Sequence, residues 1–184
     1  MVPYSVTSIL TEEETDKLLQ VYRSLPSSLA HQDYNLFDVD KRSVPKSMID
    51  DPNLPFKKID QFADLKLMGC YFVEYTPESW TKLHTDDDGK VGLTIVTMVD
   101  TKHLVGGETL VALPYTKNAR PADRYRKGES PAGDDLCVLS TIDVSDGQSM
   151  IYGPKLRHGV AQVRMGTRLV LVNWYFKDGY DATV

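Results

Sequence analysis

Histidine is scarce in this chain of 184 residues, which contains only four. A metal centre or an acid–base centre that needs imidazole must therefore draw on very few candidates. One candidate opens the sequence His84-Thr85-Asp86. Residues two apart in an extended strand point to the same side, so this imidazole and this carboxylate could converge on one ion. The alternative is a loop histidine beside a solvated acidic turn, because Asp87 and Asp88 follow directly.

His158 is the second candidate, 72 residues beyond Asp86, between the turn Gly153-Pro154 and a run rich in β-branched residues. Taken alone, a histidine of intermediate burial preference is more often satisfied within the fold than bound to a metal. With His84 and Asp86, however, it completes a set of two imidazoles and one carboxylate. That set leaves three octahedral positions open and is typical of non-haem Fe(II) oxygenases. Zn²⁺ accepts the same ligand types, so the set alone does not decide the metal.

Arg168 follows His158 by ten residues and opens the apolar run 169–172. A guanidinium at the start of such a strand is costly to bury without a partner. It is also the side chain best shaped to hold a carboxylate through two parallel hydrogen bonds. The alternative is an arginine at a strand end that faces solvent or an internal acid.

Two helices are expected ahead of these residues. Thr11 and Glu14 form a capping-box pattern, and apolar residues at helical spacing continue until Pro26. A second helix is predicted over residues 55–66. The segment 27–54 between them is interpreted as a long polar connection, and loops of that length are usually functional or mobile.

From residue 67 the sequence changes to short runs rich in β-branched and aromatic residues, separated by Gly, Pro and Asp clusters. The predicted strands cover residues 68–75, 91–100, 108–113, 136–144, 148–152, 159–164 and 168–176. Because no helical periodicity intervenes, the pattern favours a β-sandwich, jelly roll or barrel, with the N-terminal helices packed on one face. The stretch 115–134 interrupts it with three arginines and two prolines and is interpreted as an insertion or lid.

The linked set of His-x-Asp, a distant His and an Arg ten residues later resembles the Fe(II)- and 2-oxoglutarate-dependent dioxygenases. Finer features are similar to the prolyl 4-hydroxylase branch, including the oxygen-sensing prolyl hydroxylases. These features are Tyr75 nine residues before His84, the glycine-pair segment 106–114, and the closing segment 146–176. The similarity covers about 68–178. Many collagen-type enzymes have Lys where this chain has Arg168, whereas the oxygen-sensing branch has Arg.

The resemblance implies a mainly β (α+β) protein: a double-stranded β-helix of the jelly-roll or cupin type, with N-terminal helices packed on one face. We expect one domain over 1–184, with helices and a loop in 1–66 and the β-helix core in 67–178.

The site residues are also implied by the resemblance. His84, Asp86 and His158 would bind Fe(II), and Arg168 would hold the far carboxylate of 2-oxoglutarate. Tyr75 would donate its hydroxyl to the same carboxylate, unless it is a packed strand aromatic. Thr94 or Thr97 could add a further hydroxyl there.

The implied reaction consumes 2-oxoglutarate and O₂, releases succinate and CO₂, and leaves a hydroxyl on a former C–H bond. Ascorbate is a further candidate cofactor. Asp86 favours hydroxylation, because related halogenases have a small residue at that position. The leading hypothesis is prolyl 4-hydroxylation of a protein or peptide. The alternatives are hydroxylation of a free amino acid or other small molecule, and a catalytically silent jelly-roll binding module.

The substrate partner is the least determined feature. The loops 32–53 and 115–134 are predicted to cover the mouth of the site, unless they are ordinary surface loops. Arginines in the second loop would favour an acidic peptide or a carboxylate substrate. Trp80 and Trp174 are candidates for lining the pocket, with core packing favoured for Trp174.

Composition narrows the partners and the compartment. The chain has 21 Lys+Arg and 26 Asp+Glu, a formal charge of −5, which argues against a nucleic-acid partner. Cys70 and Cys137 are too few for a disulfide framework and are expected to be small buried side chains. No run of eighteen apolar residues and no targeting signal stands out. These observations favour a soluble cytoplasmic protein with no membrane partner.

Overall fold

The computed structural model describes residues 4–27, 36–114 and 137–180. Its helices are α1 (Glu12–Ser24), α2 (Lys46–Ile49) and α3 (Phe56–Asp60). Its strands are β1 (Tyr4–Ser8), β2 (Leu36–Ser43), β3 (Leu67–His84), β4 (Val91–Asp100), β5 (Val105–Gly106), β6 (Thr109–Pro114), β7 (Cys137–Ile142), β8 (Gln148–Tyr152), β9 (Arg157–Val160), β10 (Val163–Met165) and β11 (Arg168–Phe176). Within these ranges, no helix is both long and apolar enough to cross a lipid bilayer.

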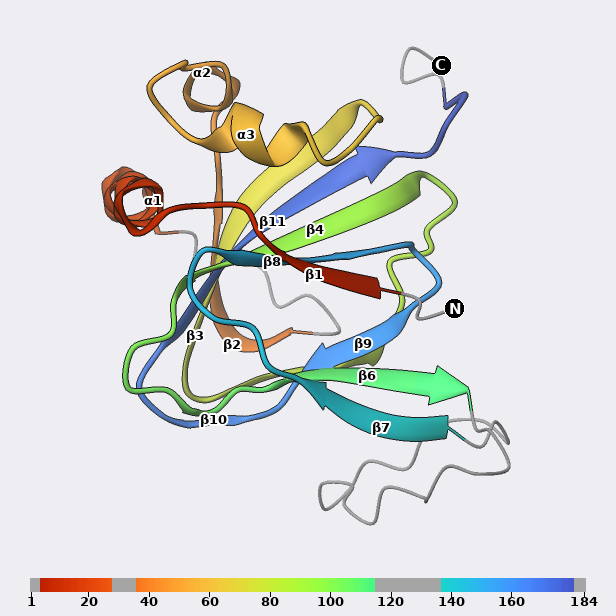
Figure 1. The fold of residues 1–184 in the computed structure, drawn as a ribbon. Coiled ribbons are helices and arrows are strands. Elements are labelled where there is room, and N and C mark those ends of the chain that lie inside the picture. Colours follow the sequence, from red (N-terminus) through yellow and green to blue (C-terminus); the bar gives the residue numbers. More distant parts are fainter. Residues whose placement is uncertain (1–3, 28–35, 115–136, 181–184) are drawn as a thin grey trace.

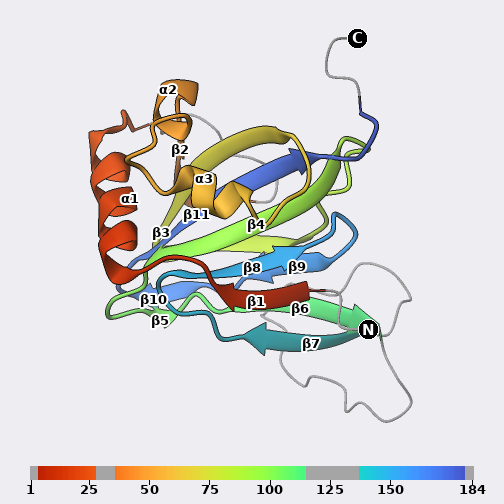
Figure 2. The same cartoon turned by 45° about the horizontal axis from the view of Figure 1, so that its top comes forward.

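Most of the strands form one curled antiparallel sheet. The strand order is β1-β8-β4-β11-β3-β9-β6-β7, with β2 added beside β3, and β5 and β10 form a small separate pair. The sheet curls so that β6 and β7 lie on the side away from the helices, whereas β3, β11 and β4 lie next to them (Figure 1, Figure 2). This arrangement is the predicted jelly-roll, double-stranded β-helix architecture.

The helices cover the outer face of β3, β4 and β11 (Figure 2), as the sequence predicted. The core beneath them joins apolar side chains of the helices to those of the sheet, among them Leu18 of α1, Ile59 of α3, Phe72 of β3, Ile95 of β4 and Leu171 of β11. All five are essentially inaccessible to solvent. Burial of this apolar interface stabilises the part of the sheet that carries the candidate site.

Strand β11 shows why a nearly continuous apolar run is needed here. Leu169 and Leu171 face the helices, whereas Val170 and Val172 line a cavity on the other side of the sheet. Alternate side chains of a strand point to opposite faces. Because both faces of this strand are covered, neither set can be polar without a specific reason.

The first helix begins with the predicted capping box. The backbone N–H of Glu14 donates to the hydroxyl of Thr11 at 3.3 Å, and the backbone N–H of Thr11 donates to the Glu14 carboxylate at 2.8 Å. The same carboxylate accepts from Lys58 at 2.6 Å, which connects the start of α1 to α3. The capping box therefore both begins α1 and, through Lys58, joins α1 to α3.

Replacing Thr11 with alanine is expected to lower the free energy of unfolding by about 1 kcal/mol, because the backbone N–H of Glu14 loses its side-chain acceptor. Chemical denaturation of the purified protein measures this loss, and Thr11→Ser, which keeps the hydroxyl, is the matched control. Equal stability of the alanine variant and the parent would show that the cap contributes nothing.

The interpretation of residues 27–54 as a polar connection is wrong over residues 36–49, which form β2 and α2. Strand β2 has few apolar residues because its polar side chains bind the helix beside it. Arg42 forms an ion pair with Asp40 at 2.8 Å and donates to the backbone carbonyls of Tyr22 and Leu25 at the end of α1. The predicted cover of the site by 32–53 stays a prediction for residues 36–49, which are ordered as a strand and a short helix. The predicted lid 115–134 lies outside the described residues.

Other boundaries also differ from the predictions. The strand expected at 68–75 continues to His84, and the strand expected at 159–164 divides into β9 and β10. The helix expected over 55–66 ends at Asp60, and by Lys66 the chain has joined the sheet, where the Lys66 carbonyl accepts the N–H of Phe176. Strands β1 and β5 were not predicted.

Candidate functional site

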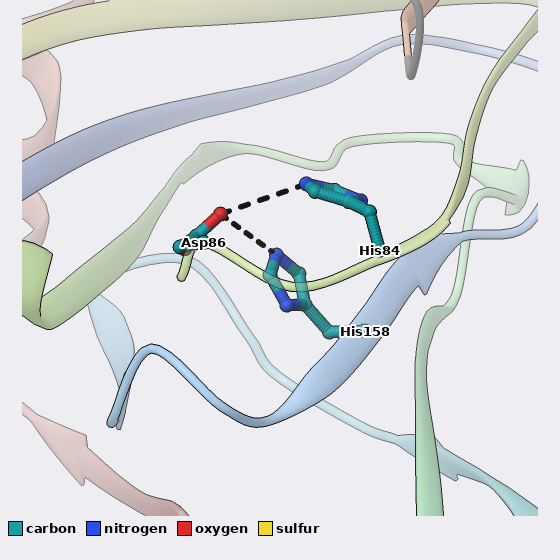
Figure 3. Close-up of side chains that lie close together, drawn as sticks. All are labelled: His84, Asp86 and His158. Carbon is teal, nitrogen blue, oxygen red and sulfur yellow. Dashed lines mark ion pairs between the residues drawn. The ribbon is translucent and has the colours of Figure 1, made fainter. Parts of the chain in front are cut away.

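The three predicted metal ligands converge at one place, where β3 meets β9 (Figure 3). His84 is the last residue of β3 and lies opposite His158 of β9 in the antiparallel register. Asp86 lies just beyond β3, and its backbone N–H donates to the carbonyl of Pro154 at 3.1 Å. The Nε2 atoms of His84 and His158 lie 3.6 and 3.8 Å from the same carboxylate oxygen, Oδ1 of Asp86.

Backbone carbonyls fix the orientation of both imidazoles. Nδ1 of His84 lies 2.8 Å from the carbonyl oxygen of Lys82, and Nδ1 of His158 lies 3.0 Å from that of Leu156. A carbonyl only accepts hydrogen bonds, so each Nδ1 carries the proton and each Nε2 keeps a lone pair directed into the site. Burial lowers the pKa of His158, against the opposing influence of Asp86, and so favours the neutral form that a metal requires.

Asp86 is oriented by a hydroxyl from the neighbouring strand. The side chain of Thr94, which is fully buried in β4, donates to Oδ2 of Asp86 at 2.7 Å. This leaves Oδ1 facing the two histidines. The role predicted for Thr94, a hydroxyl for the co-substrate, is therefore revised, because its hydroxyl is used on the carboxylate. The hydroxyl of Thr97 pairs with that of Ser149 at 2.7 Å.

Thr94→Val is expected to weaken binding of Mn²⁺ about 10-fold or more, the usual effect of losing a hydrogen bond that orients a metal ligand. Thr97→Val is a matched control on the same strand, because it makes the same change without touching a candidate ligand. Calorimetric titration of the metal measures both. If the two variants lose affinity equally, the contact between Thr94 and Asp86 does not orient the site.

The two histidines of the triad line a narrow cavity of about 80 Å³ between the two layers of the sheet. Its wall is mostly apolar and aromatic: Tyr71, Val73, Val96, Met98, Met150, Val160, Val170, Val172 and Trp174. The cavity also includes His84, His158 and Arg168. Such a wall excludes water and strengthens every electrostatic interaction inside the cavity.

Arg168 is 3% exposed and lines this cavity. Its Nη2 donates to the hydroxyl of Thr109 at 2.8 Å, whereas its Nη1 is buried without a hydrogen-bond partner. In the part of the chain that the structure describes, no carboxylate pairs with it, so neither alternative from the sequence applies. A buried guanidinium without an anion is costly. Nη1 of Arg168 is therefore available to an anionic group that enters the cavity.

Tyr75 lies directly opposite Arg168 in the register of β3 and β11. Its ring lines the cavity, and the guanidinium of Arg168 lies 5.3 Å from the ring centroid. Its hydroxyl is within hydrogen-bond distance of the hydroxyl of Thr81, at 2.7 Å. The predicted contact of Tyr75 with a co-substrate carboxylate stays a prediction, and its ring already supports the guanidinium.

Two residues of the cavity had no role predicted from the sequence: Thr109, within the glycine-pair segment 106–114, and Tyr152, within the predicted strand 148–152. Trp174 was a candidate for lining the pocket, although core packing was favoured; it lines the cavity and makes an edge-to-face contact with Tyr71, with 5.3 Å between the ring centroids. Trp80, the other tryptophan predicted to line the pocket, is absent from the cavity wall. Hydropathy cannot separate the two faces of a strand that is covered on both sides.

No family model matches the sequence, and no curated protein is similar to it. Solved structures are similar over nearly the whole chain. A prolyl 4-hydroxylase of Pseudomonas putida matches with a TM-score of 0.62 at 16% identity, covering 96% of this chain and 94% of that one. A Trichoplax adhaerens prolyl hydroxylase, solved with a peptide of hypoxia inducible factor, matches with a TM-score of 0.64 at 12% identity, covering 95% and 83%.

HygX from Streptomyces hygroscopicus, solved with nickel and 2-oxoglutarate, matches with a TM-score of 0.65 at 15% identity, covering 97% and 84%. The chain has the fold of the 2-oxoglutarate–Fe(II) oxygenases. Within this 2-oxoglutarate oxygenase fold, the site described above occupies the cavity between the two layers. At identities of 12–16% the similarity to these structures shows the fold of the chain. A shared fold does not determine the reaction, which depends on the residues of the site.

Proposed function

We propose that the protein is an Fe(II)- and 2-oxoglutarate-dependent dioxygenase that hydroxylates a C–H bond. One observation carries this proposal: both histidines of a His-Asp-His cluster and a buried guanidinium without an anion line the same narrow, mostly apolar cavity. The first can hold a metal ion and the second can hold an anion. A 2-oxo dicarboxylic acid satisfies both at once, because one end can chelate the metal and the other end is a carboxylate.

The residues present fit Fe(II). Two imidazoles offer their Nε2 atoms, and one carboxylate offers Oδ1, from positions within 4.8 Å of one another. Three protein ligands leave positions for a chelating co-substrate and O₂. When bound, the iron would supply the oxidative chemistry that no side chain can perform. The contribution of His84, Asp86 and His158 is to fix the ion, with their orientation set by Lys82, Leu156 and Thr94.

Arg168 would hold the far carboxylate of 2-oxoglutarate. Its Nη2 is fixed by Thr109 and its plane is supported by Tyr75, so Nη1 is the group left for the ligand. A charge-assisted hydrogen bond in a dry cavity is stronger than the same bond in water. This residue distinguishes the proposed oxygenase from a hydrolytic zinc site with the same three ligands, which has no need of an internal anion-binding arginine.

For the substrate we infer a prolyl residue in a protein or peptide. Support comes from the two prolyl hydroxylases among the similar structures, one of which holds a peptide. A small molecule is the second candidate, because HygX has also been solved with hygromycin B bound. Hydroxylation of either candidate substrate would convert 2-oxoglutarate to succinate, so succinate release is expected in both cases.

The experiment is an assay of the full chain with Fe(II), 2-oxoglutarate and O₂, in which succinate is quantified. Proline-containing peptides and free proline are then compared by mass spectrometry for the gain of one oxygen atom. Succinate release with oxygen incorporated into a peptide supports the proposal. Metal binding without succinate release from any candidate substrate would instead indicate a silent binding module.

A further inference from the structure

Tyr152 carries a buried phenol at the edge of the His-Asp-His cluster, and the proposed function gives this residue no role. It lies in β8, between Tyr4 of β1 and Thr94 of β4 in the register of the sheet, and is 3% exposed. Its hydroxyl oxygen lies 3.0 Å from Nε2 of His158, and the two ring centroids are 4.6 Å apart. Nε2 is the atom through which His158 faces Asp86 (Figure 3).

The direction of this hydrogen bond follows from the other nitrogen of the same ring. Nδ1 of His158 donates to the carbonyl of Leu156, so Nε2 carries no proton in the neutral imidazole and has one lone pair. The phenol of Tyr152 must therefore be the donor. A metal ion bound by His158 needs the same lone pair, so the ion and the hydroxyl cannot both use it.

The pKa of Tyr152 is raised well above its ordinary value by burial and by the Asp86 carboxylate, which agrees with a phenol that donates. Once an ion occupies the lone pair of Nε2, the hydroxyl loses this buried acceptor. The bond between Tyr152 and His158 therefore opposes metal binding.

We propose that Tyr152 is a positioning residue that competes with the metal ion for the lone pair of His158 and thereby weakens metal binding. The inference rests on the proposed function, because it presumes that His158 is a metal ligand. Tyr152→Phe keeps the ring and removes only the competing hydroxyl. Metal affinity should therefore rise about three- to tenfold, which is the size expected for one net hydrogen bond.

The test is calorimetric titration of Mn²⁺, without co-substrate, into four forms of the full chain: the parent, Tyr152→Phe, Tyr175→Phe and His158→Ala. Tyr175→Phe is the matched control, since Tyr175 is also a buried strand tyrosine, but its hydroxyl donates to Asp60 and it does not line the cavity. Melting temperatures verify that all four are folded. A merely structural role for Tyr152 would lower metal affinity when its hydroxyl is removed, whereas competition predicts a gain.

The expected result is tighter binding in Tyr152→Phe, parent-like binding in Tyr175→Phe and a large loss in His158→Ala. Equal or weaker binding in Tyr152→Phe, with the loss in His158→Ala retained, overturns the competition and leaves the proposed function standing. Binding that does not depend on His158 in any form overturns the proposed function itself, and the role of Tyr152 with it.

Discussion

Replacement of His158 by alanine is expected to abolish succinate release and to reduce Mn²⁺ affinity by more than about 100-fold, because even losing a group that merely orients a ligand costs 10- to 100-fold. His158 supplies one of only three protein ligands, and its Nε2 lies 3.8 Å from Oδ1 of Asp86. The measurements are the succinate assay and calorimetric titration of the metal.

His103 offers a control for this variant, because it is an exposed histidine away from the cavity. Its backbone has a positive φ of 61°, which asparagine tolerates better than alanine, so the control is His103→Asn. This variant should bind metal and release succinate like the parent. Normal turnover in His158→Ala would remove the metal hypothesis.

The second large effect is expected at Arg168. Arg168→Met should raise the KM for 2-oxoglutarate by about 100-fold or more. The variant loses at least one charge-assisted hydrogen bond to the far carboxylate of 2-oxoglutarate, together with the positive charge proposed to hold that carboxylate. Metal affinity without co-substrate should change little, since Arg168 does not contact the three ligands.

The same substitution is expected to leave the melting temperature unchanged or to raise it. In the parent, Nη1 of Arg168 is buried without a partner, so the guanidinium costs folding free energy that a methionine of similar length would not. Steady-state kinetics and thermal unfolding test both parts. An unchanged requirement for 2-oxoglutarate would assign Arg168 to the structure and not to the co-substrate.

Much of the site could be predicted because its chemistry is concentrated in a few residue types. Only four histidines were available, and Arg168 stood at the start of a strand where a charge is unexpected. Strands β4, β8 and β11 were predicted with the bounds that the structure has, because their apolar runs are long and end at clear turn residues.

The remainder depends on which segments pair with one another, and local pattern does not contain that information. Arg42 of β2 looks like a surface charge until it is seen to bind the carbonyls at the end of α1. Thr94 was expected at the co-substrate, but the packing of β4 against the turn that carries Asp86 directs its hydroxyl to the carboxylate. Tyr152 gave no signal, because a tyrosine in a strand is ordinary.

The central claim is that one cavity holds both a metal ion and the dicarboxylic co-substrate. It is tested most directly by calorimetric titration of 2-oxoglutarate into the full chain with Mn²⁺ present and with the metal removed by a chelator. We predict one 2-oxoglutarate bound per chain, only when the metal is present, and much weaker binding in Arg168→Met. Failure to bind 2-oxoglutarate with the metal present, or binding that the chelator does not affect, would contradict the claim.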